Sequence, residues 1–313
     1  MGNMKCLVLG GGGFIGSHIC DQLVAAGHEV RIFEKVGLSK NNIHHLGNRV
    51  EWMEGDFLNP DCLRNAVNGT EIIFHLISST LPKDSNDNPV YDITSNIIPT
   101  LHMLEAARVA GVRKVILSSS GGTVYGIPRK IPITEEHPTE PICSYGIHKL
   151  MIEKYLFLYN KLYGLDYAIM RISNPYGERQ RQTGGQGVIP IFLHKILHDE
   201  PIEIWGDGSV VRDYLHISDV ARAAVMLMDA QLSHKILNIG SGTGRSLNAL
   251  LEEIAKVAGL IPNVRYTPCR AFDVPANVLD ITLAKDTLGW TPQVNLADGL
   301  RRTMEYLRNI GRT

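Results

Sequence analysis

The first half of the chain alternates short apolar runs with longer amphipathic segments. The short runs have the length and composition of buried strands, and they fall at residues 5–10, 29–34, 50–56, 71–78, 112–120 and 165–173. Apolar positions at helical spacing follow Phe14, cover 100–111 and extend from Tyr145 to Tyr163. Strands that alternate with helices are typical of βαβ units, so the pattern predicts a mostly parallel sheet with helices on both faces.

The pattern changes after Asn174. A loop rich in glycine and glutamine covers residues 177–187, and the later strands and helices are shorter and contain more proline. An apolar helix at 220–230 and a strand at 235–240 indicate a return to the main sheet. We therefore expect an α/β fold with a Rossmann-type doubly wound parallel sheet in residues 1–173, joined by segments at about 215–240. A smaller, discontinuous C-terminal α/β substrate domain is expected mainly in residues 174–313.

The composition narrows the choice of partner. The chain has 313 residues, of which 44% are hydrophobic and 20% charged, as in ordinary globular proteins. Lys and Arg (31) nearly balance Asp and Glu (32), which disfavours binding to nucleic acid or to an anionic membrane. The five cysteines are scattered without a CxxC pair. We expect a cytoplasmic protein with a small-molecule partner, no membrane segment and no catalytic metal.

A glycine-rich turn follows the first expected strand. Gly10, Gly13 and Gly16 have GxxGxxG spacing and lead into the helix that starts with Phe14 and Ile15. Glycines at such a turn let the backbone approach a pyrophosphate, whose charge then lies at the helix N-terminus. Similar turns also occur for packing alone. The sequence nevertheless favours a dinucleotide site that includes these five residues.

Acidic residues follow the second and third strands. Glu34 lies at the end of the second strand, where a carboxylate binds the adenosine ribose and repels a 2′-phosphate, so it favours NAD. Lys35 is a basic neighbour that would suit the phosphate of NADP instead. Asp56 follows the third strand, where it would contact the adenine or simply form a turn.

Tyr145 and Lys149 are four residues apart on the same expected helix. Such residues share one helix face, and a nearby cation lowers the pKa of a tyrosine toward the working pH. Tyr145 would then serve as a general base toward an alcohol. The alternative is an exposed pair with little energetic importance.

The chain resembles a known family, the extended short-chain dehydrogenase/reductases, and within it the UDP-glucose 4-epimerase type. The resemblance rests on "GGGGFIG", "SSSGGTVYG", "YGIHK", "RISNPYG", "GDGSVVRDYLHISDVA" and "DVPANVLDITLAKDTLGWTPQ", in family order. It implies that NAD takes a hydride from sugar C4 while Tyr145 takes the proton of the 4-hydroxyl. The resulting 4-keto sugar receives the hydride on its other face. In this family Lys149 would hold the nicotinamide ribose.

The resemblance also assigns residues to the UDP-sugar. Asn174, Arg212, Arg270 and Asp273 match contacts to the diphosphate and ribose. The alternatives are that Asn174 only shapes a turn and that Arg212 only pairs with Asp213 at the surface. Asn277 stands where some epimerases have tyrosine, so the resemblance implies a wider pocket that accepts UDP-GlcNAc. It further implies a homodimer formed through a helical bundle that includes the Tyr145 helix.

The stretch "LSSSGGTVYG" supplies the hydroxyls expected at the reacting sugar. We expect Ser120 and Thr123 to act together in catalysis and Ser119 to lie nearer the cofactor. Gly121 and Gly122 stand where dehydratases and decarboxylases of the family carry acids, which favours epimerisation. Two alternatives share the same fold: an NADPH-dependent reductase of a 4-keto nucleotide sugar, and an NAD-sensing protein without activity.

Overall fold

The computed structural model describes residues 2–182, 187–268 and 274–310, and the chain divides into two compact units. The first unit consists of Met1–Gly126, Pro138–Arg171 and Ala221–Leu237. The second unit consists of Ile127–His137, Ile172–Val220 and Asn238–Thr313. The chain therefore passes from one unit to the other several times, and each unit is described by itself.

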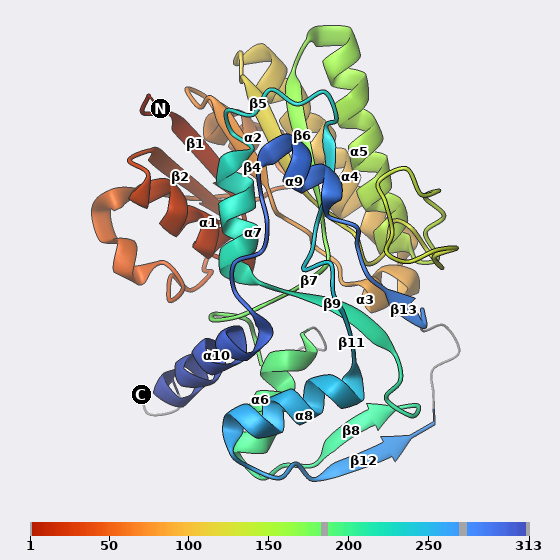
Figure 1. The fold of residues 1–313 in the computed structure, drawn as a ribbon. Helices are drawn as coiled ribbons and strands as arrows, with labels where there is room; N and C mark the ends of the chain where they lie inside the picture. The colour runs from red at the N-terminus through yellow and green to blue at the C-terminus, as the bar shows by residue number, and fades with distance from the viewer. Residues whose placement is uncertain (1, 183–186, 269–273, 311–313) are drawn as a thin grey trace. The chain divides into compact units, whose positions relative to one another are not determined.

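A seven-stranded sheet forms the first unit (Figure 1). Its strand order is β10-β6-β5-β4-β1-β2-β3, and the pairs from β5 to β3 run parallel. The strands are β1 (Lys5–Leu9), β2 (Glu29–Glu34), β3 (Val50–Glu54), β4 (Ile72–His75), β5 (Lys114–Ser120), β6 (Asp166–Ile172) and β10 (Ile236–Ile239). The strand order reverses between β1 and β4, which is where doubly wound sheets bind ligands. The predicted Rossmann-type sheet is confirmed.

Helices cover this sheet because their apolar side chains pack against those of its buried strands. The helices of this unit are α1 (Phe14–Ala25), α2 (Pro60–Val67), α3 (Pro82–Asp87), α4 (Pro89–Val109) and α5 (Ser144–Tyr163), with a short η1 (His44–Arg49). Residues of α2, α4 and α5 share one core with β1, β4, β5 and β6. Two of the helices begin with Pro after an Asn whose side chain caps the first turn, Asn59 for α2 and Asn88 for α4.

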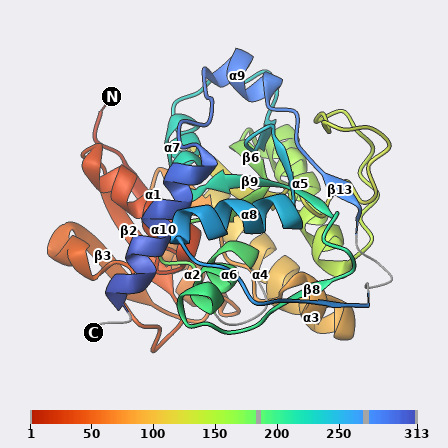
Figure 2. The ribbon, with the colours of Figure 1, turned by 60° about the horizontal axis from the view of Figure 1, so that its bottom comes forward.

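The second unit contains smaller sheets and its own core. One sheet joins β7 (Asn174–Tyr176), β9 (Val211–His216), β11 (Gly244–Ser246) and β13 (Ala276–Asn277), and a second pairs β8 (Ile202–Trp205) with β12 (Val264–Thr267). The helices are α6 (Val188–Leu197), α8 (Leu247–Ala258), α9 (Thr282–Leu288) and α10 (Leu296–Ile310), and α7 (Ile217–Met226) crosses the boundary between the units. Helices α6, α8 and α10 pack together around this core (Figure 2).

One segment departs from the expected domain division. Residues Ile127–His137, inside the range expected for the first domain, group with the second unit. Ile133 holds this segment to the second unit, because its N–H donates to the Val278 carbonyl and its own carbonyl accepts the N–H of Asp280, both at 2.8 Å.

Trp290 is completely buried and donates its Nε1–H to the Asp219 carbonyl at 3.1 Å. Over the described ranges, every helix is too short or too polar to cross a membrane.

Candidate active site

The glycine turn between β1 and α1 needs glycine for steric reasons. Gly10 has a φ of +87°, in the left-handed region that favours glycine. The N–H of Gly13 donates to the Gly10 carbonyl at 3.1 Å, and α1 starts at the next residue. A Cβ on Gly16 would lie 2.2 Å from the Gly10 oxygen and 2.7 Å from the Gly11 Cα. Only glycine lets α1 approach the strand so closely.

The N-terminus of α1 offers donors to an anion. Gly13 caps the helix without a side-chain hydrogen bond, and the first turn contains no acidic residue. The first N–H groups of any α-helix, here those of Phe14 and Ile15, have no acceptor within the helix. A pyrophosphate at this end would gain these donors and the favourable end of the helix dipole. The turn therefore fits the dinucleotide that the sequence predicts.

Glu34 and Asp56 differ in their surroundings. Glu34 is only 7% exposed and accepts the N–H of Gly12 at 2.9 Å, and burial raises the pKa of its carboxyl group. Lys35 is exposed. Asp56 is also exposed, and its carboxylate accepts the N–H of Leu58 at 2.9 Å, as in a turn. Glu34 thus lies against the glycine turn, whereas the contact of Asp56 with adenine stays a prediction.

Tyr145 and Lys149 lie together on the first turns of α5. The Nζ atom of Lys149 is 5.7 Å from the centroid of the Tyr145 ring and donates to the Ser118 carbonyl at 3.0 Å. Lys149 is only 2% exposed, and burial lowers its pKa to about 8 although Asp92 and Glu153 act in the opposite direction. Lys149 is therefore buried and Tyr145 half-buried near the end of β5, and the alternative of an exposed pair is wrong.

The structure corrects the expectation that the pKa of Tyr145 is lowered. Burial raises this pKa to about 12, and the neighbouring Cys143 and Asp92 act in the same direction. A hydrogen bond with Ser78 lowers it, but by less. The protein alone therefore does not lower the pKa of this tyrosine, because removal of the phenolate from water is the largest contribution and raises it.

The three expected hydroxyl groups have different partners. Ser119 is buried and donates to Glu153 at 2.5 Å, and Glu153 forms a buried ion pair with Arg171 at 2.7 Å. Ser120 is half-buried, and its carbonyl accepts the N–H of Val124 at 3.2 Å in the turn after β5. The Thr123 Oγ1 atom is buried and has no hydrogen-bond partner within the described part of the chain.

Thr123 lies directly against the start of α5. A Cβ on Gly146, the residue after Tyr145, would be 2.7 Å from the Thr123 carbonyl oxygen. The structure thus brings this turn and Tyr145 together, as the sequence predicts for a shared site. Ser119 instead faces the Glu153–Arg171 pair, and its contact with the cofactor stays a prediction.

Sequence reasoning missed a polar cluster beside Tyr145. Asp92 on α4 is completely buried, and its carboxylate accepts hydrogen bonds from Ser144 at 2.7 Å and from His148 at 2.9 Å. The sequence carries a weak signal of it, since Asp92, Ser95 and Asn96 interrupt the buried side of an otherwise apolar helix.

The second unit brings several of the expected nucleotide contacts onto neighbouring strands. Asn174 on β7 donates to the Asp213 carbonyl at 3.0 Å. Arg212 on β9 is in register with Asn277 on β13, and its guanidinium donates to the carbonyls of Val211 at 2.9 Å and Val274 at 2.7 Å. Asn277 is 1% exposed.

The burial of Asp213 excludes the alternative of a surface ion pair with Arg212. This residue is completely buried, and its carboxylate accepts hydrogen bonds from the N–H and the hydroxyl of Ser241 at 2.7 Å each. An Arg212–Asp213 pair at the surface is therefore wrong. Arg270 and Asp273, expected at the diphosphate and ribose, lie outside the described residues.

The described residues offer neither a metal cluster nor a disulfide between cysteines. In those ranges, no group of three or more His, Cys, Asp or Glu side chains is placed to hold a metal ion. Cys6, Cys20, Cys62 and Cys143 are free thiols.

Comparison with known proteins adds sequence and structural relatives. The UDP-glucose 4-epimerase of Mycolicibacterium smegmatis is 38% identical over 310 residues, which cover 98% of this chain and 99% of that protein. The structure of UDP-glucose 4-epimerase with UDP-glucose from Thermotoga maritima matches with a TM-score of 0.93 and 36% identity, and covers 98% of this chain and 99% of that chain.

A relative with a different activity also matches. The dTDP-4-dehydro-6-deoxyglucose reductase of Escherichia coli is 33% identical over 309 residues, 96% of this chain and 97% of that protein. A sequence model of the NAD dependent epimerase/dehydratase family matches residues 6–240, and the chain therefore belongs to that family.

Proposed function

We propose that this protein is an NAD-dependent 4-epimerase of UDP-sugars that interconverts UDP-glucose and UDP-galactose through a 4-keto sugar. The observation that carries the proposal is the Tyr145–Lys149 pair at the start of α5, with a buried lysine and a half-buried tyrosine, in the same unit as the glycine turn. The two UDP-glucose 4-epimerases that match nearly the whole chain support the choice of substrate.

Gly10, Gly13, Phe14, Ile15 and Gly16 would hold the cofactor's pyrophosphate, and Glu34 its adenosine ribose. NAD, when bound, supplies the acceptor and donor of the hydride at sugar C4. An acidic residue at the position of Glu34 disfavours the extra phosphate of NADP, because a carboxylate there repels a 2′-phosphate. Lys149 would hold the nicotinamide ribose from its place beside the Ser118 carbonyl.

Tyr145 moves the proton in the proposed reaction. As phenolate it accepts the proton of the sugar 4-hydroxyl on its phenolic oxygen, and it returns that proton when the ketone is reduced. Because burial raises its pKa to about 12, the phenolate needs positive charge beside it. The Lys149 ammonium provides such a charge from the next helical turn.

Hydroxyl groups of Ser120 and Thr123 would orient the sugar O4. Thr123 Oγ1 supports this role, because a buried hydroxyl without a partner within the described residues costs free energy unless a ligand satisfies it. Ser119, held by Glu153, would act nearer the cofactor. The absence of an acid at Gly121 and Gly122 favours epimerisation over dehydration.

Residues of the second unit would bind the nucleotide. We assign Asn174, Arg212, Arg270 and Asp273 to the diphosphate and ribose of UDP, since the planar guanidinium of arginine matches phosphate geometry. Asn277 would leave room for an N-acetyl group, so UDP-GlcNAc is a second substrate. In the variant Asn277→Tyr we expect turnover of UDP-GlcNAc to fall while turnover of UDP-glucose is kept. Equal losses with both substrates would contradict this assignment.

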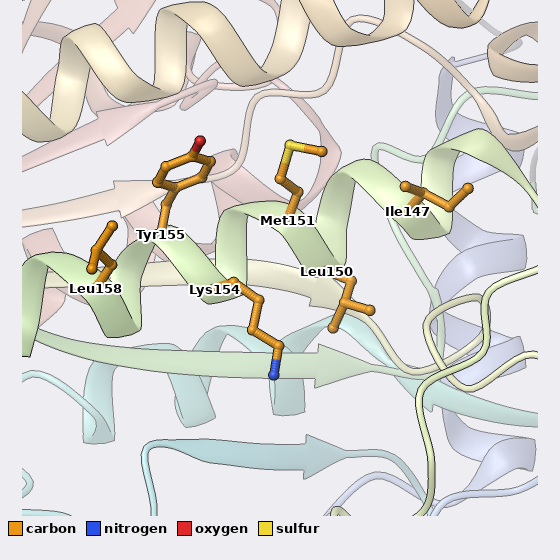
Figure 3. A pocket seen from close by; sticks show the side chains of 6 residues that line it. All are labelled: Ile147, Leu150, Met151, Lys154, Tyr155 and Leu158. Carbon is orange, nitrogen blue, oxygen red and sulfur yellow. The ribbon is translucent and has the colours of Figure 1, made fainter.

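The protein would act as a homodimer in the cytoplasm. A pocket of about 380 Å³ lies along α5 and is lined mainly by apolar side chains, those of Ile147, Leu150, Met151, Lys154, Tyr155 and Leu158 (Figure 3). Ile147 and Leu158 in this pocket are 50% and 42% exposed, and exposed apolar side chains that form a large patch mark an interaction site. The free thiols of the described cysteines suit a reducing compartment.

The substitution Tyr145→Phe tests the proposal at its central residue. It removes the proton acceptor and keeps the ring, so we expect the rate of C4 epimerisation to fall about 100- to 10,000-fold. Tyr159→Phe, on the same helix, is the matched control and should keep wild-type turnover. An unchanged rate in Tyr145→Phe would exclude the mechanism.

A reductase of a 4-keto nucleotide sugar is the second candidate, because the reductase of Escherichia coli is 33% identical. A reductase consumes NADPH in proportion to product, whereas an epimerase needs no external reductant. Oxidation of added NADPH by the purified protein with a 4-keto nucleotide sugar therefore separates the two activities.

A further inference from the structure

A buried polar cluster joins α4 to the N-terminus of α5, and the proposed reaction does not use it. Its centre is Asp92, which is completely buried. The carboxylate accepts hydrogen bonds from Ser144 at 2.7 Å, from His148 Nδ1 at 2.9 and 3.0 Å, from Asn96 at 3.2 Å and from the hydroxyl of Thr80. These hydrogen bonds outweigh burial and lower the pKa of Asp92, so the group is ionised. A buried carboxylate is stable only with such donors.

His148 is neutral and carries its proton on Nδ1. It is 1% exposed, and burial lowers its pKa to about 4, with the Lys149 ammonium acting in the same direction. Nδ1 faces the Asp92 carboxylate, whereas Nε2 is buried without a hydrogen-bond partner in the described ranges. A proton on Nε2 would lack an acceptor there, so the Nδ1–H tautomer is the one that fits.

The other titratable groups around His148 come from three elements. Lys149, Tyr145 and Cys143 lie on or next to the start of α5, Asp92 lies on α4, and His75 lies at the end of β4. His75 is also neutral, because burial lowers its pKa to about 3. Asp92 and Lys149 are therefore the charged groups that act on the imidazole at neutral pH.

The imidazole of His148 in turn packs against Tyr145. The two ring centroids are 4.9 Å apart, with an interplanar angle of 69°, so the rings meet edge to face. The backbone around Tyr145 is also fixed, because its N–H donates to Ser85 and the N–H of Ser144 donates to Asn86, both at 2.9 Å. The position of the tyrosine ring thus depends on groups from α3, α4 and α5.

We propose that Asp92 and His148 are positioning residues for Tyr145: the carboxylate fixes the imidazole, and the imidazole fixes the tyrosine ring for proton transfer. The inference rests on the proposed epimerase function. A displacement of about 1 Å at a reacting group can cost roughly 100-fold in rate, so loss of either contact is expected to lower kcat. Substrate binding needs neither contact and should be unaffected.

Two substitutions of His148 separate the two contacts. Asn keeps a donor near the place of Nδ1 but removes the ring from Tyr145, whereas Phe keeps a ring but removes the donor to Asp92. We expect His148→Asn and His148→Phe each to lower kcat about 10- to 100-fold with KM for UDP-glucose unchanged. His102→Asn, an exposed histidine on α4, is the control and should match the wild type.

The imidazole NMR signals of the wild-type protein give a readout that does not depend on activity. Signals absent from the His148→Asn spectrum identify His148, and they should show the neutral Nδ1–H form across pH 6 to 8 without titration. An Nε2–H tautomer, or a titration near the ordinary histidine pKa of about 6.5, would overturn the inference.

The kinetic outcomes are also distinguishable. If wild-type protein forms the C4 epimer and both His148 variants keep its kcat, the inference is wrong and the proposed function stands. If the loss of kcat disappears once the rates are divided by the concentration of folded protein, the cluster only stabilises the fold and the inference is wrong as well. If wild-type protein forms no C4 epimer, the proposed function fails and the inference falls with it.

Discussion

At the scale of single residues, burial sets the proton affinities of Tyr145 and Lys149 more strongly than their proximity does. Their spacing of four residues is visible in the sequence, and it places them together on one helix face as predicted. The removal of Lys149, and in part of Tyr145, from water depends on the packing of α5 against the sheet, which no local pattern reports. The expected low pKa of Tyr145 therefore fails, and the raised value of about 12 follows from desolvation.

The two candidate hydroxyl groups give a direct test of the turn after β5. Thr123→Ala removes a buried hydroxyl whose partner would be the sugar, so we expect kcat to fall roughly 100-fold and stability to be kept. Ser120→Ala should lower kcat as well, because both hydroxyls would orient O4. Steady-state kinetics with UDP-glucose measure both, and wild-type turnover in the two variants would refute the assignment.

The lowered pKa of Lys149 predicts how the free energy of unfolding changes with pH. Its pKa is about 8 in the folded protein and about 10.4 in an unfolded chain, so the unfolded state binds more protons between these values. The contribution of Lys149 to the free energy of unfolding therefore rises as the pH increases through this window. Denaturant unfolding of cofactor-free wild type and Lys149→Met should show a difference that shrinks with rising pH. Parallel curves would contradict the buried ammonium.

At the scale of elements, the turn between β1 and α1 depends on contacts that differ from glycine to glycine. A Cβ on Gly16 would meet backbone atoms at 2.2 and 2.7 Å, whereas a Cβ on Gly12 would meet the side chains of Trp52 and Leu38 at 3.1 and 3.2 Å. Side chains can move and backbone cannot. Both glycines belong to the same sequence motif, so only the structure separates them.

The variant Gly16→Ala should consequently be the more damaging one. We expect a loss of about 1–3 kcal/mol in the free energy of unfolding and at least about tenfold weaker NAD binding, because α1 must move away from the strand. Gly12→Ala is the matched comparison and should lose less of both. Calorimetric titration measures the NAD affinity of both variants, and denaturant unfolding measures their free energies of unfolding. A larger loss in Gly12→Ala than in Gly16→Ala would disprove the steric argument.

Elements were predicted well where one strong pattern controls them. The strand that ends in "LSSS" and the helix expected from Tyr145 to Tyr163 are present as β5 and α5, since apolar period and length are local properties. The Asp92–His148 cluster could not be predicted, because its members lie 56 residues apart. Their pairing needs the packing of α4 on α5.

At the scale of the whole molecule, the seven-stranded sheet follows from the alternation of strands and helices along the chain. The expected return of the chain corresponds to Ala221–Leu237 of the first unit. The place of Ile127–His137 in the second unit depends on backbone hydrogen bonds to Val278 and Asp280, which lie far away in sequence. Such long-range pairing leaves no local signal in a loop rich in proline.

The apolar surface of α5 predicts a dimer. Leu158 is 42% exposed and lines the pocket on this helix, so Leu158→Lys should weaken self-association and shift the protein toward the monomer. Ile261→Lys is the control, because Ile261 is 95% exposed in the second unit. Light scattering after size-exclusion chromatography measures both masses. A monomeric wild type, or equal effects of the two substitutions, would contradict the proposed interface.

The most direct test of the central claim is incubation of the purified protein with UDP-glucose, without any added reductant, followed by chromatographic separation of the C4 epimers. Parallel samples contain UDP-GlcNAc and the corresponding uronic acids. The account predicts that UDP-galactose accumulates to an equilibrium mixture and that Tyr145→Phe abolishes most of its formation. Absence of any C4 epimer from wild-type protein, or product formation only with NADPH consumed in equal amount, would contradict it.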